Sequence, residues 1–527
     1  MSKETGKFVK GALILSVAAL VAKVLSAFFR IPLGDLIGNV GMGYYGYGYP
    51  IYTFFSSIAI VAIPSTISKL VAEKRVHGEY KEAHTLFVYT MRLMMILGLV
   101  MSALFIFGAP LMIEVFKWEA QTIYSLWGLG LSPLFVCVMG VYRGYFQGMQ
   151  NMTPTAISQV IENFGRVLAG LGLAYFFMST GNVGYAAGGA SFGSVVGGIC
   201  GALVLFGFYM RHRGSIHEEI ATQRKPEKVV TFQTVTKMIL AMAVPISIGA
   251  AVNSVMTFMD SAIVTVVLVK DGMDSLGAAD LFGQLTNTAT LVNLPLAFGM
   301  ALVVGVVPAI AEAVARKDQT EMQDKMELGS RFAMLLSLPA AIGLSVLATP
   351  IMGFLYPEST QGGPILAVAA LSIPFIMLGQ AMTGVLQGLG KVWIPVQAIF
   401  IAGFAKAILN VLLVGSMGII GAPIASIVGY ATFTLYNFLA VKKITQFKLN
   451  TGLVFVKPLI AAVLMGGVAF VTYRGLGSAL DASSTLQNAL MTLISVGSGA
   501  VIYAIIIFIV GGITKKDLLE FKKKKEK

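Results

Sequence analysis

Residues 11–29 read GALILSVAALVAKVLSAFF, a continuous apolar run long enough to cross the ~30 Å hydrocarbon core of a bilayer as a helix. The run follows a short basic N-terminus, Met1–Lys10. A signal peptide would require a small-residue cleavage site and a soluble remainder. Because the remainder is itself rich in apolar runs, these residues predict the first transmembrane helix.

The composition of the whole chain agrees with this interpretation. Of 527 residues, 56% are hydrophobic and 12% are charged, whereas soluble domains carry ~25% charged residues. So few charges cannot cover the surface of a soluble protein of this length. The composition therefore excludes a soluble enzyme, a nucleic-acid-binding protein and a disordered protein, and it predicts an all-α polytopic membrane protein.

Apolar stretches of about 20 residues, the length that a bilayer requires, recur along the chain. We count fourteen and predict fourteen transmembrane helices. Their expected spans are 8–33, 42–70, 88–112, 122–142, 154–178, 184–210, 236–264, 281–310, 329–354, 364–388, 394–416, 421–441, 453–474 and 485–512.

The distribution of basic residues predicts the orientation of these helices. The chain has 38 Lys and Arg against 25 Asp and Glu, a net charge of +13. With the N-terminus in the cytoplasm, thirty of the 38 fall in cytoplasmic segments, three in outer loops and five within helices. This asymmetry follows the positive-inside rule. It predicts that both termini are cytoplasmic, including the basic tail 513–527, and it explains the positive charge without a nucleic-acid partner.

Short motifs recur about 240 residues apart and indicate an internal duplication. Leu131-Ser132 recurs as Leu371-Ser372, and Gln147-Gly148 recurs as Gln387-Gly388. We therefore predict two six-helix lobes with the same orientation, a parallel repeat related by an axis along the membrane normal. The expected divisions are 1–212 (N-lobe, helices 1–6), 213–235 (cytoplasmic linker), 236–442 (C-lobe, helices 7–12), 453–512 (helices 13 and 14) and the tail 513–527.

Enzyme motifs are absent from the sequence, which contains no P-loop, HExxH or nucleophile elbow. The longest polar segment, 211–237, is too short for a catalytic domain. We expect a transporter that requires no cofactor.

Charged residues within the expected helices are costly, by at least ~2.5 kcal/mol each on insertion scales, and they usually face a cavity or a partner. The candidates are Lys23, Arg30, Arg92, Arg166, Lys406, Glu162 and Asp260. Lys23 and Arg30 lie two turns apart on one face of helix 1, near Ser26. Two cations on one face predict the wall of a cationic cavity, although separate structural pairing is the alternative.

The remaining intramembrane charges allow two interpretations. Glu162 and Arg166 are four residues apart, so they can form an internal ion pair on helix 5 as well as contact substrate. Asp260 on helix 7 either pairs with Lys406 on helix 11 or binds a coupling cation, such as Na⁺, together with Asn410. We expect no other metal site.

Helix 8 concentrates polar residues that can line the same cavity or hydrogen-bond to neighbouring helices. They are Gln284, Asn287, Thr288, Thr290 and Asn293.

The stretch from Gly11 through Lys23 to Phe29-Arg30-Ile31-Pro32, followed by Tyr49-Pro50-Ile51-Tyr52, resembles MOP-superfamily lipid-linked saccharide flippases. It is most similar to MurJ-like lipid II flippases of the Gram-positive YtgP type, with SpoVB-type proteins close by. The resemblance implies two lobes around a cavity with alternating access, and cavity cations that hold the pyrophosphate of an undecaprenyl-linked saccharide. It also implies that helices 13 and 14 form a groove for the lipid tail.

The resemblance therefore predicts a flippase that moves lipid II from the inner to the outer leaflet of the bacterial cytoplasmic membrane. Lys23, Arg30, Ser26, Glu162, Arg166 and Asn287 are the expected substrate-binding residues. Na⁺ or the membrane potential would drive transport, and the partners are the lipid-linked saccharide, the bilayer and, as a further candidate, cell-wall synthesis proteins. The alternatives are a flippase for a spore-cortex, teichoic or capsule precursor, and a MATE-type cation-coupled drug exporter.

Overall fold

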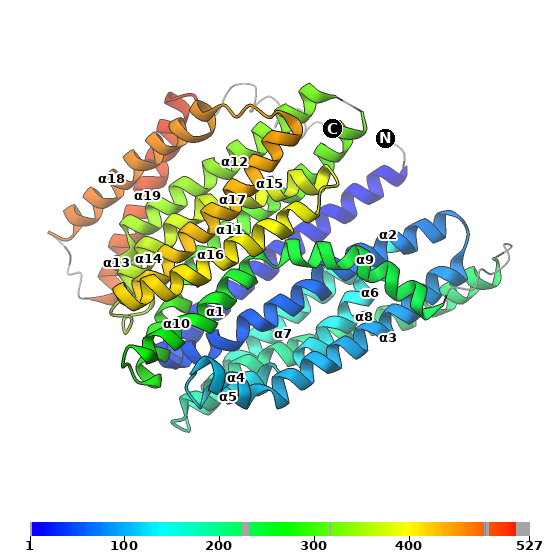
Figure 1. The fold of residues 1–527 in the computed structure, drawn as a ribbon, viewed down its shortest axis with the longest axis horizontal. Coiled ribbons are helices and arrows are strands. Elements are labelled where there is room, and N and C mark those ends of the chain that lie inside the picture. The colour runs from blue at the N-terminus through cyan, green and yellow to red at the C-terminus, as the bar shows by residue number, and fades with distance from the viewer. Residues whose placement is uncertain (1–2, 224–230, 317, 479, 481–483, 513–527) are drawn as a thin grey trace. The chain divides into compact units, whose positions relative to one another are not determined.

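A computed structural model describes the chain except for residues 1–2, 224–230, 317, 479, 481–483 and 513–527. All regular secondary structure in this described part is helical (Figure 1). Eleven of its helices or unbroken helical runs are long and apolar enough to cross a membrane. Each of the fourteen expected spans falls on helix, but several helices run together, so the number of crossings stays a prediction.

The chain divides into two compact units, Met1–Gly283 and Gln284–Lys527. The predicted lobes divide instead at the linker 213–235, so the two divisions differ by the helices of 232–283. The first unit contains α1 (Lys3–Ser57), η1 (Ile58–Ala62), α2 (Ile63–Val76), α3 (Tyr80–Phe107), α4 (Ala109–Phe116), α5 (Thr122–Leu129), α6 (Ser132–Gly148), α7 (Thr153–Met178), α8 (Val183–Ala221), α9 (Phe232–Ala250), α10 (Val252–Lys270) and the start of α11 (Ser275–Ala315).

The first two expected spans are joined in α1 through a kink at Gly38. This residue has a φ of 65° inside an otherwise helical run. Only glycine adopts that left-handed conformation at little cost, so it allows the chain to change direction between the two expected spans. A single π-helical turn, η1, then precedes Pro64 at the start of α2.

Close packing of α7 against α8 depends on glycines spaced four residues apart along α8. A Cβ atom on Gly193 would lie 2.6 Å from the Cα of Gly170 in α7. Gly197 faces the backbone of Glu162, and Gly201 faces its Cβ at 3.2 Å. Small residues at this spacing allow two membrane helices to approach closely. The approach fixes the part of α7 that carries the predicted Glu162–Arg166 pair.

The second unit continues from within α11 to the C-terminal helices. It contains α12 (Gln319–Val346), α13 (Ala348–Leu355), α14 (Gly362–Ala369), η2 (Ala370–Ser372), α15 (Ile373–Gly388), α16 (Trp393–Met417), η3 (Gly418–Ile420), α17 (Gly421–Thr445), η4 (Gly452–Val456), α18 (Lys457–Leu476) and α19 (Thr485–Ile509). Both α18 and α19 pack on α12, where Leu335, Ala461 and Ile507 form a small core (Figure 1). The two helices outside the predicted repeat are thus anchored to one helix of this unit.

The pattern of broken helices recurs between the two parts of the chain. The break between α3 and α4 has its counterpart between α12 and α13, and α13 begins 239 residues after α4. The break between α5 and α6 has its counterpart between α14 and α15, where α14 begins 240 residues after α5. Likewise α16 begins 240 residues after α7. These offsets match those of the repeated sequence motifs.

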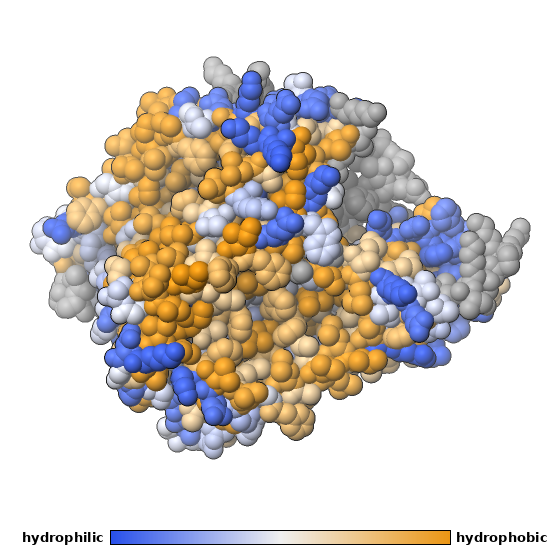
Figure 2. Space-filling view, in the orientation of Figure 1, coloured by the Kyte–Doolittle hydropathy of each residue, from blue (hydrophilic) through white to orange (hydrophobic). Residues whose placement is uncertain are grey.

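Large apolar side chains cover much of the surface. Figure 2 shows hydrophobic residues over most of the face in view, with hydrophilic residues gathered towards its rims. Individual exposed side chains include Phe28 on α1, Phe404 on α16 and Ile509 on α19, at 67%, 70% and 78% exposure. Such a surface is unfavourable in water and favourable in lipid, so these helices face the hydrocarbon of a membrane.

Candidate functional site

A buried charged cluster lies between α6 and α7, and we define it as Arg143, Glu162 and Arg166. Nη2 of Arg143, from α6, lies 2.8 Å from Oε2 of Glu162, and its Nε donates a hydrogen bond of 3.0 Å to the hydroxyl of Ser158. Nη2 of Arg166 lies 3.7 Å from the other carboxylate oxygen of Glu162. Ser158, Glu162 and Arg166 are spaced four residues apart, which places them on one helix face. The predicted contact between Glu162 and Arg166 is therefore present, but a second arginine makes the shorter bond.

Arg143 is the functional candidate that sequence reasoning missed. The expected span 122–142 ends one residue before it, so it counted as a cytoplasmic residue. The structure instead continues α6 to Gly148 and leaves Arg143 only 4% exposed. The sequence did contain a signal that the helix continues past residue 142. Arg143 lies four residues before the Gln147-Gly148 motif, and the residues between them are compatible with a helix.

Aromatic residues of α1 connect this cluster to Arg30. Nη2 of Arg166 donates a hydrogen bond of 3.2 Å to the hydroxyl of Tyr52. The ring of Tyr52 contacts that of Tyr49, with centroids 5.7 Å apart. The guanidinium of Arg30 lies 4.5 Å from the centroid of Tyr49, within the range of a cation–π interaction. These tyrosines therefore link two arginines along α1.

The predicted residues of helix 1 differ in what the structure describes. Ser26 donates a hydrogen bond of 3.2 Å to the side-chain oxygen of Asn163, so it ties α1 to α7. The side chain of Lys23 lies outside those that the structure describes, although its backbone belongs to α1. Arg92, which we expected among the intramembrane charges, is exposed on α3 next to Tyr89.

The cluster of Arg143, Glu162 and Arg166 has a net positive charge. The buried cluster contains two guanidinium groups and one carboxylate, and Arg30 adds another cation along the same tyrosine chain. Guanidinium groups bind phosphate through directed, charge-assisted hydrogen bonds, which are strong where water is excluded. Nε of Arg166 has no hydrogen-bond partner within the described part of the chain. The arrangement is therefore suited to an anion with several oxygen atoms.

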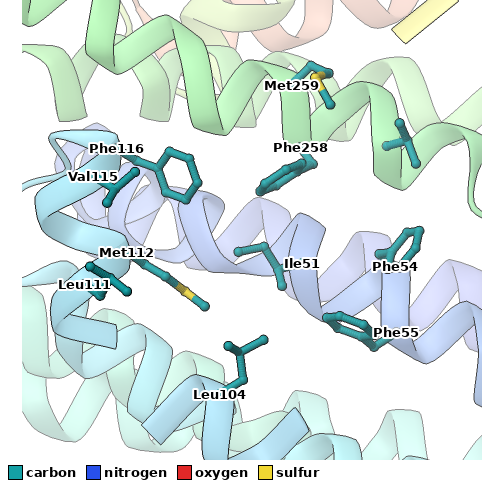
Figure 3. A pocket seen from close by; sticks show the side chains of 11 residues that line it. Ile51, Phe54, Phe55, Leu104, Leu111, Met112, Val115, Phe116, Phe258 and Met259 are labelled. Carbon is teal, nitrogen blue, oxygen red and sulfur yellow. The ribbon is translucent and has the colours of Figure 1, made fainter. Parts of the chain in front are cut away.

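The face of α1 turned away from Tyr49 and Tyr52 lines an apolar pocket of about 500 Å³. Ile51 lies in the middle of the lining, and the rings of Phe116 of α4 and Phe258 of α10 contact each other edge-to-face at one side, with centroids 5.9 Å apart (Figure 3). The full lining consists of Ile51, Phe54, Phe55, Leu104, Leu111, Met112, Val115, Phe116, Val255, Phe258 and Met259. A lining of this composition accommodates hydrocarbon.

Asp260 lies on α10 in the first unit, where 8% of its surface is exposed. Its neighbour Ser261 accepts a hydrogen bond of 2.8 Å from the indole of Trp118, which fixes α10 to the end of α4. Lys406 belongs to the second unit, so the predicted pairing of Asp260 with Lys406 is not described.

The predicted residues of the second unit are deeply buried. Asn287 on α11 and Asn410 on α16 have no exposed surface, and Lys406 is 1% exposed. Lys406 packs against Gly429 of α17, where a Cβ would lie 3.1 Å from that of the lysine. One turn before Asn287, the side-chain oxygen of Gln284 accepts a hydrogen bond of 2.8 Å from the backbone of Gln361. At least part of the polar face of helix 8 therefore bonds to neighbouring backbone.

Comparison with known protein families gives two matches. Residues 8–314 match the model of the polysaccharide biosynthesis protein family, and residues 245–412 match the MatE family.

Individual relatives extend over most of the chain. It is 29% identical to stage V sporulation protein B of Bacillus subtilis, covering 84% of this chain and 85% of the relative. It is 24% identical to lipid II flippase MurJ of the same organism, with 95% and 94% covered. Among solved structures, lipid II flippase MurJ in an inward closed conformation is similar with a TM-score of 0.67 at 17% identity, covering 95% of this chain and 98% of that one. At such identity the structural likeness shows a shared fold.

Proposed function

Because the chain belongs to the polysaccharide biosynthesis protein family of the MOP superfamily, we propose that it is a flippase for an undecaprenyl-pyrophosphate-linked saccharide. We propose lipid II as the substrate, and a spore-cortex, teichoic or capsule precursor as the alternative. Two of the compared relatives support the choice, since one is a lipid II flippase and the other a sporulation protein. The activity is transport, without covalent chemistry or a cofactor.

The observation that carries this proposal is the charge of the cluster formed by Arg143, Glu162 and Arg166, in which two guanidinium groups face one carboxylate. Two arginines share the carboxylate of Glu162, and the tyrosine chain leads from Arg166 to Arg30. A pyrophosphate has the charge and the oxygen atoms to complete this set. The substrate-binding residues that we propose are Lys23, Ser26, Arg30, Glu162, Arg166 and Asn287, to which the structure adds Arg143. Glu162 acts by holding the two arginines in place.

The two faces of α1 suit the two parts of such a substrate. One face carries Tyr49 and Tyr52 with the arginines, and the opposite face lines the apolar pocket. A lipid-linked saccharide is likewise divided into an anionic headgroup and a hydrocarbon chain. We propose that the headgroup follows the tyrosine face while part of the chain remains in contact with the apolar face.

The proposed architecture has fourteen crossings, with two six-helix lobes of parallel orientation and helices 13 and 14 added. The recurrence of broken helices about 240 residues apart supports the duplication. Both termini are cytoplasmic in this proposal, on the charge distribution of the sequence. The lobes rock about the site, which opens first to the cytoplasm and then to the outside.

The driving force in this proposal is Na⁺ or the membrane potential. Asp260 and Asn410 are the residues that we propose for a coupling cation, with the pairing of Asp260 and Lys406 as the alternative. Measuring transport into proteoliposomes with and without a Na⁺ gradient, and with an imposed potential, separates the two sources.

Depletion of the protein in its own host, followed by measurement of each lipid-linked precursor on the inner leaflet, tests the function. We expect one precursor to accumulate, and wild-type protein to clear it. Lys23→Ala and Arg30→Ala should reach the membrane without clearing it, whereas Arg92→Ala should behave as wild type because Arg92 is exposed.

Two results would contradict the proposal. If Lys23→Ala and Arg30→Ala cleared the accumulated precursor at the wild-type rate, these two cations would have no role in transport. Depletion that raised sensitivity to cationic drugs, with no precursor accumulating, would favour the MATE-type exporter.

A further inference from the structure

A second apolar groove, of about 990 Å³, lies wholly within the second unit. Its lining residues lie on α12, η2, α15, α17 and α18 and on the segment between α17 and α18, and Figure 1 shows where these helices lie in the chain. Phe447, which is 1% exposed, contributes to its floor, while Leu435 and Leu459 remain 58% and 44% exposed on its walls. Its volume is at the upper end of the ~300–1,000 Å³ that ligand sites occupy. The groove is thus large enough for a ligand, and its exposed walls face lipid.

Charge is confined to one end of this groove. Among the described residues of the lining, the charged ones are Lys442, in the last turn of α17, and Lys448, in the segment that follows, and both are exposed. The hydroxyl of Thr434 donates a hydrogen bond of 2.6 Å to the carbonyl of Phe375, so its proton is used within the protein. The lining is therefore apolar along its length and positive at the end of α17.

The length of the groove matches one leaflet of a bilayer. Along α17 its lining extends from Ala431 to Lys442. Eleven residues of helix rise ~16 Å, which is about half of the ~30 Å hydrocarbon core. A molecule held here would have its charged group at the level of the lipid headgroups and its chains within one leaflet.

We propose that this groove binds one molecule of an anionic glycerophospholipid from the leaflet next to the C-terminal end of α17. Its phosphate is held by Lys442 and Lys448, and an acyl chain lies along α17 towards Ala431. The length argument favours acyl chains over a much longer polyprenyl chain. The site is separate from the charged cluster of the first unit and does not rest on the flippase function.

Native mass spectrometry of the purified full chain tests this site, with phosphatidylglycerol, phosphatidylcholine and undecaprenyl phosphate as three separate probes. The variant Lys442→Gln/Lys448→Gln removes both charges. Each lysine near a membrane surface contributes about fivefold, so phosphatidylglycerol should bind about 30-fold more weakly to this variant. Lys443→Gln is the matched control, because this lysine is exposed beside Lys442 but does not line the groove. It should bind as wild type does.

Two further variants separate charge from shape. Lys442→Arg/Lys448→Arg should retain phosphatidylglycerol, because the positive charge remains. Ala431→Phe fills the far end of the groove and should weaken phosphatidylglycerol binding without changing either lysine. The lysine variants should elute as monodisperse protein, since the lysines are exposed.

Several outcomes would overturn the proposal. They are equal binding of phosphatidylcholine and phosphatidylglycerol, an equal loss in Lys443→Gln, and preferential binding of undecaprenyl phosphate that depends on Lys442 and Lys448. The last would make the groove part of the transport path. Phospholipid binding that persists in the transport-inactive Lys23→Ala variant would keep the two proposals distinct.

Discussion

Replacing Glu162 by Gln tests whether the charged cluster supports the first unit. The substitution keeps the size of the side chain and removes the charge that Arg143 and Arg166 share. Both contacts are shielded from water, because the side chains of Arg143, Glu162 and Arg166 are 4%, 5% and 11% exposed. Removing one partner of a buried ion pair typically costs about 3–5 kcal/mol, since the other charge is left without compensation. The 2.8 Å contact of Arg143 is shorter than the 3.7 Å contact of Arg166, so most of that loss belongs to Arg143.

The assay is reversible unfolding of the purified protein in mixed micelles, analysed as a double-mutant cycle. Glu162→Gln should lower the free energy of unfolding by about 3 kcal/mol or more. Adding Arg143→Gln removes one of the two charges that Glu162→Gln leaves without compensation, so the double variant should be at least ~1.5 kcal/mol more stable than the sum of the single effects predicts. Glu312→Gln is the control, because its pairing with Arg316 is on the surface, at about 60% exposure for both side chains. That change should stay within ~0.5 kcal/mol of wild type.

The reasoning is refuted if Glu162→Gln and Glu312→Gln have the same effect on stability. It is also refuted if Glu162→Gln and Arg143→Gln are additive, because additivity means that the two side chains do not interact.

Two other substitutions test packing and a helix end in the same unfolding assay. Gly193→Ala should destabilise the protein by about 1–3 kcal/mol, because the new Cβ would lie 2.6 Å from a backbone Cα atom of α7. Gly207→Ala on the same helix is the control. Its Cβ would have no atom within 4 Å, so this change should be neutral or stabilising. Arg331→Ala should lower the free energy of unfolding by about 1.5–3 kcal/mol, because the buried guanidinium donates a 2.9 Å hydrogen bond to the carbonyl of Gly512 after α19. Arg92 is exposed, so the control Arg92→Ala should change it by less than ~0.5 kcal/mol. Equal effects within either pair would contradict the packing or the helix-end argument respectively.

The sequence predicted the helical membrane fold because membrane helices obey a simple constraint. Every backbone polar group in lipid must be bonded internally, and the length of a helix is fixed by the thickness of the bilayer. Hydropathy alone was therefore enough to predict helix within every expected span. It did not place the helix breaks, which depend on local geometry such as the left-handed Gly38 in α1 and the break at Ala251 between α9 and α10.

The site was predictable where the contacts are local and not where they are distant in sequence. Glu162 and Arg166 are one turn apart, so their contact follows from helix geometry. Arg143 and Tyr52 lie 19 and 114 residues from their partners in the cluster. Their roles depend on how α6 and α1 pack against α7, and no periodicity within one helix contains that information. An error of one residue in the end of a span was enough to remove Arg143 from the set of buried charges.

Arg143 and Arg166 make unequal contacts with Glu162, and their roles differ accordingly. Arg143 has its Nε on Ser158 and its Nη2 on Glu162, so its guanidinium is occupied by α7. Arg166 makes the longer contact with Glu162, bonds to Tyr52 and has an Nε with no partner among the described residues. A single carboxylate thus lowers the cost of burying two arginines while it neutralises only one of them. If both were neutralised, the cluster could join the helices but could not attract an anion. Arg166 therefore carries the positive charge that Glu162 does not neutralise, and the tyrosines connect it to a further cation, Arg30. Structural support alone does not explain this charge.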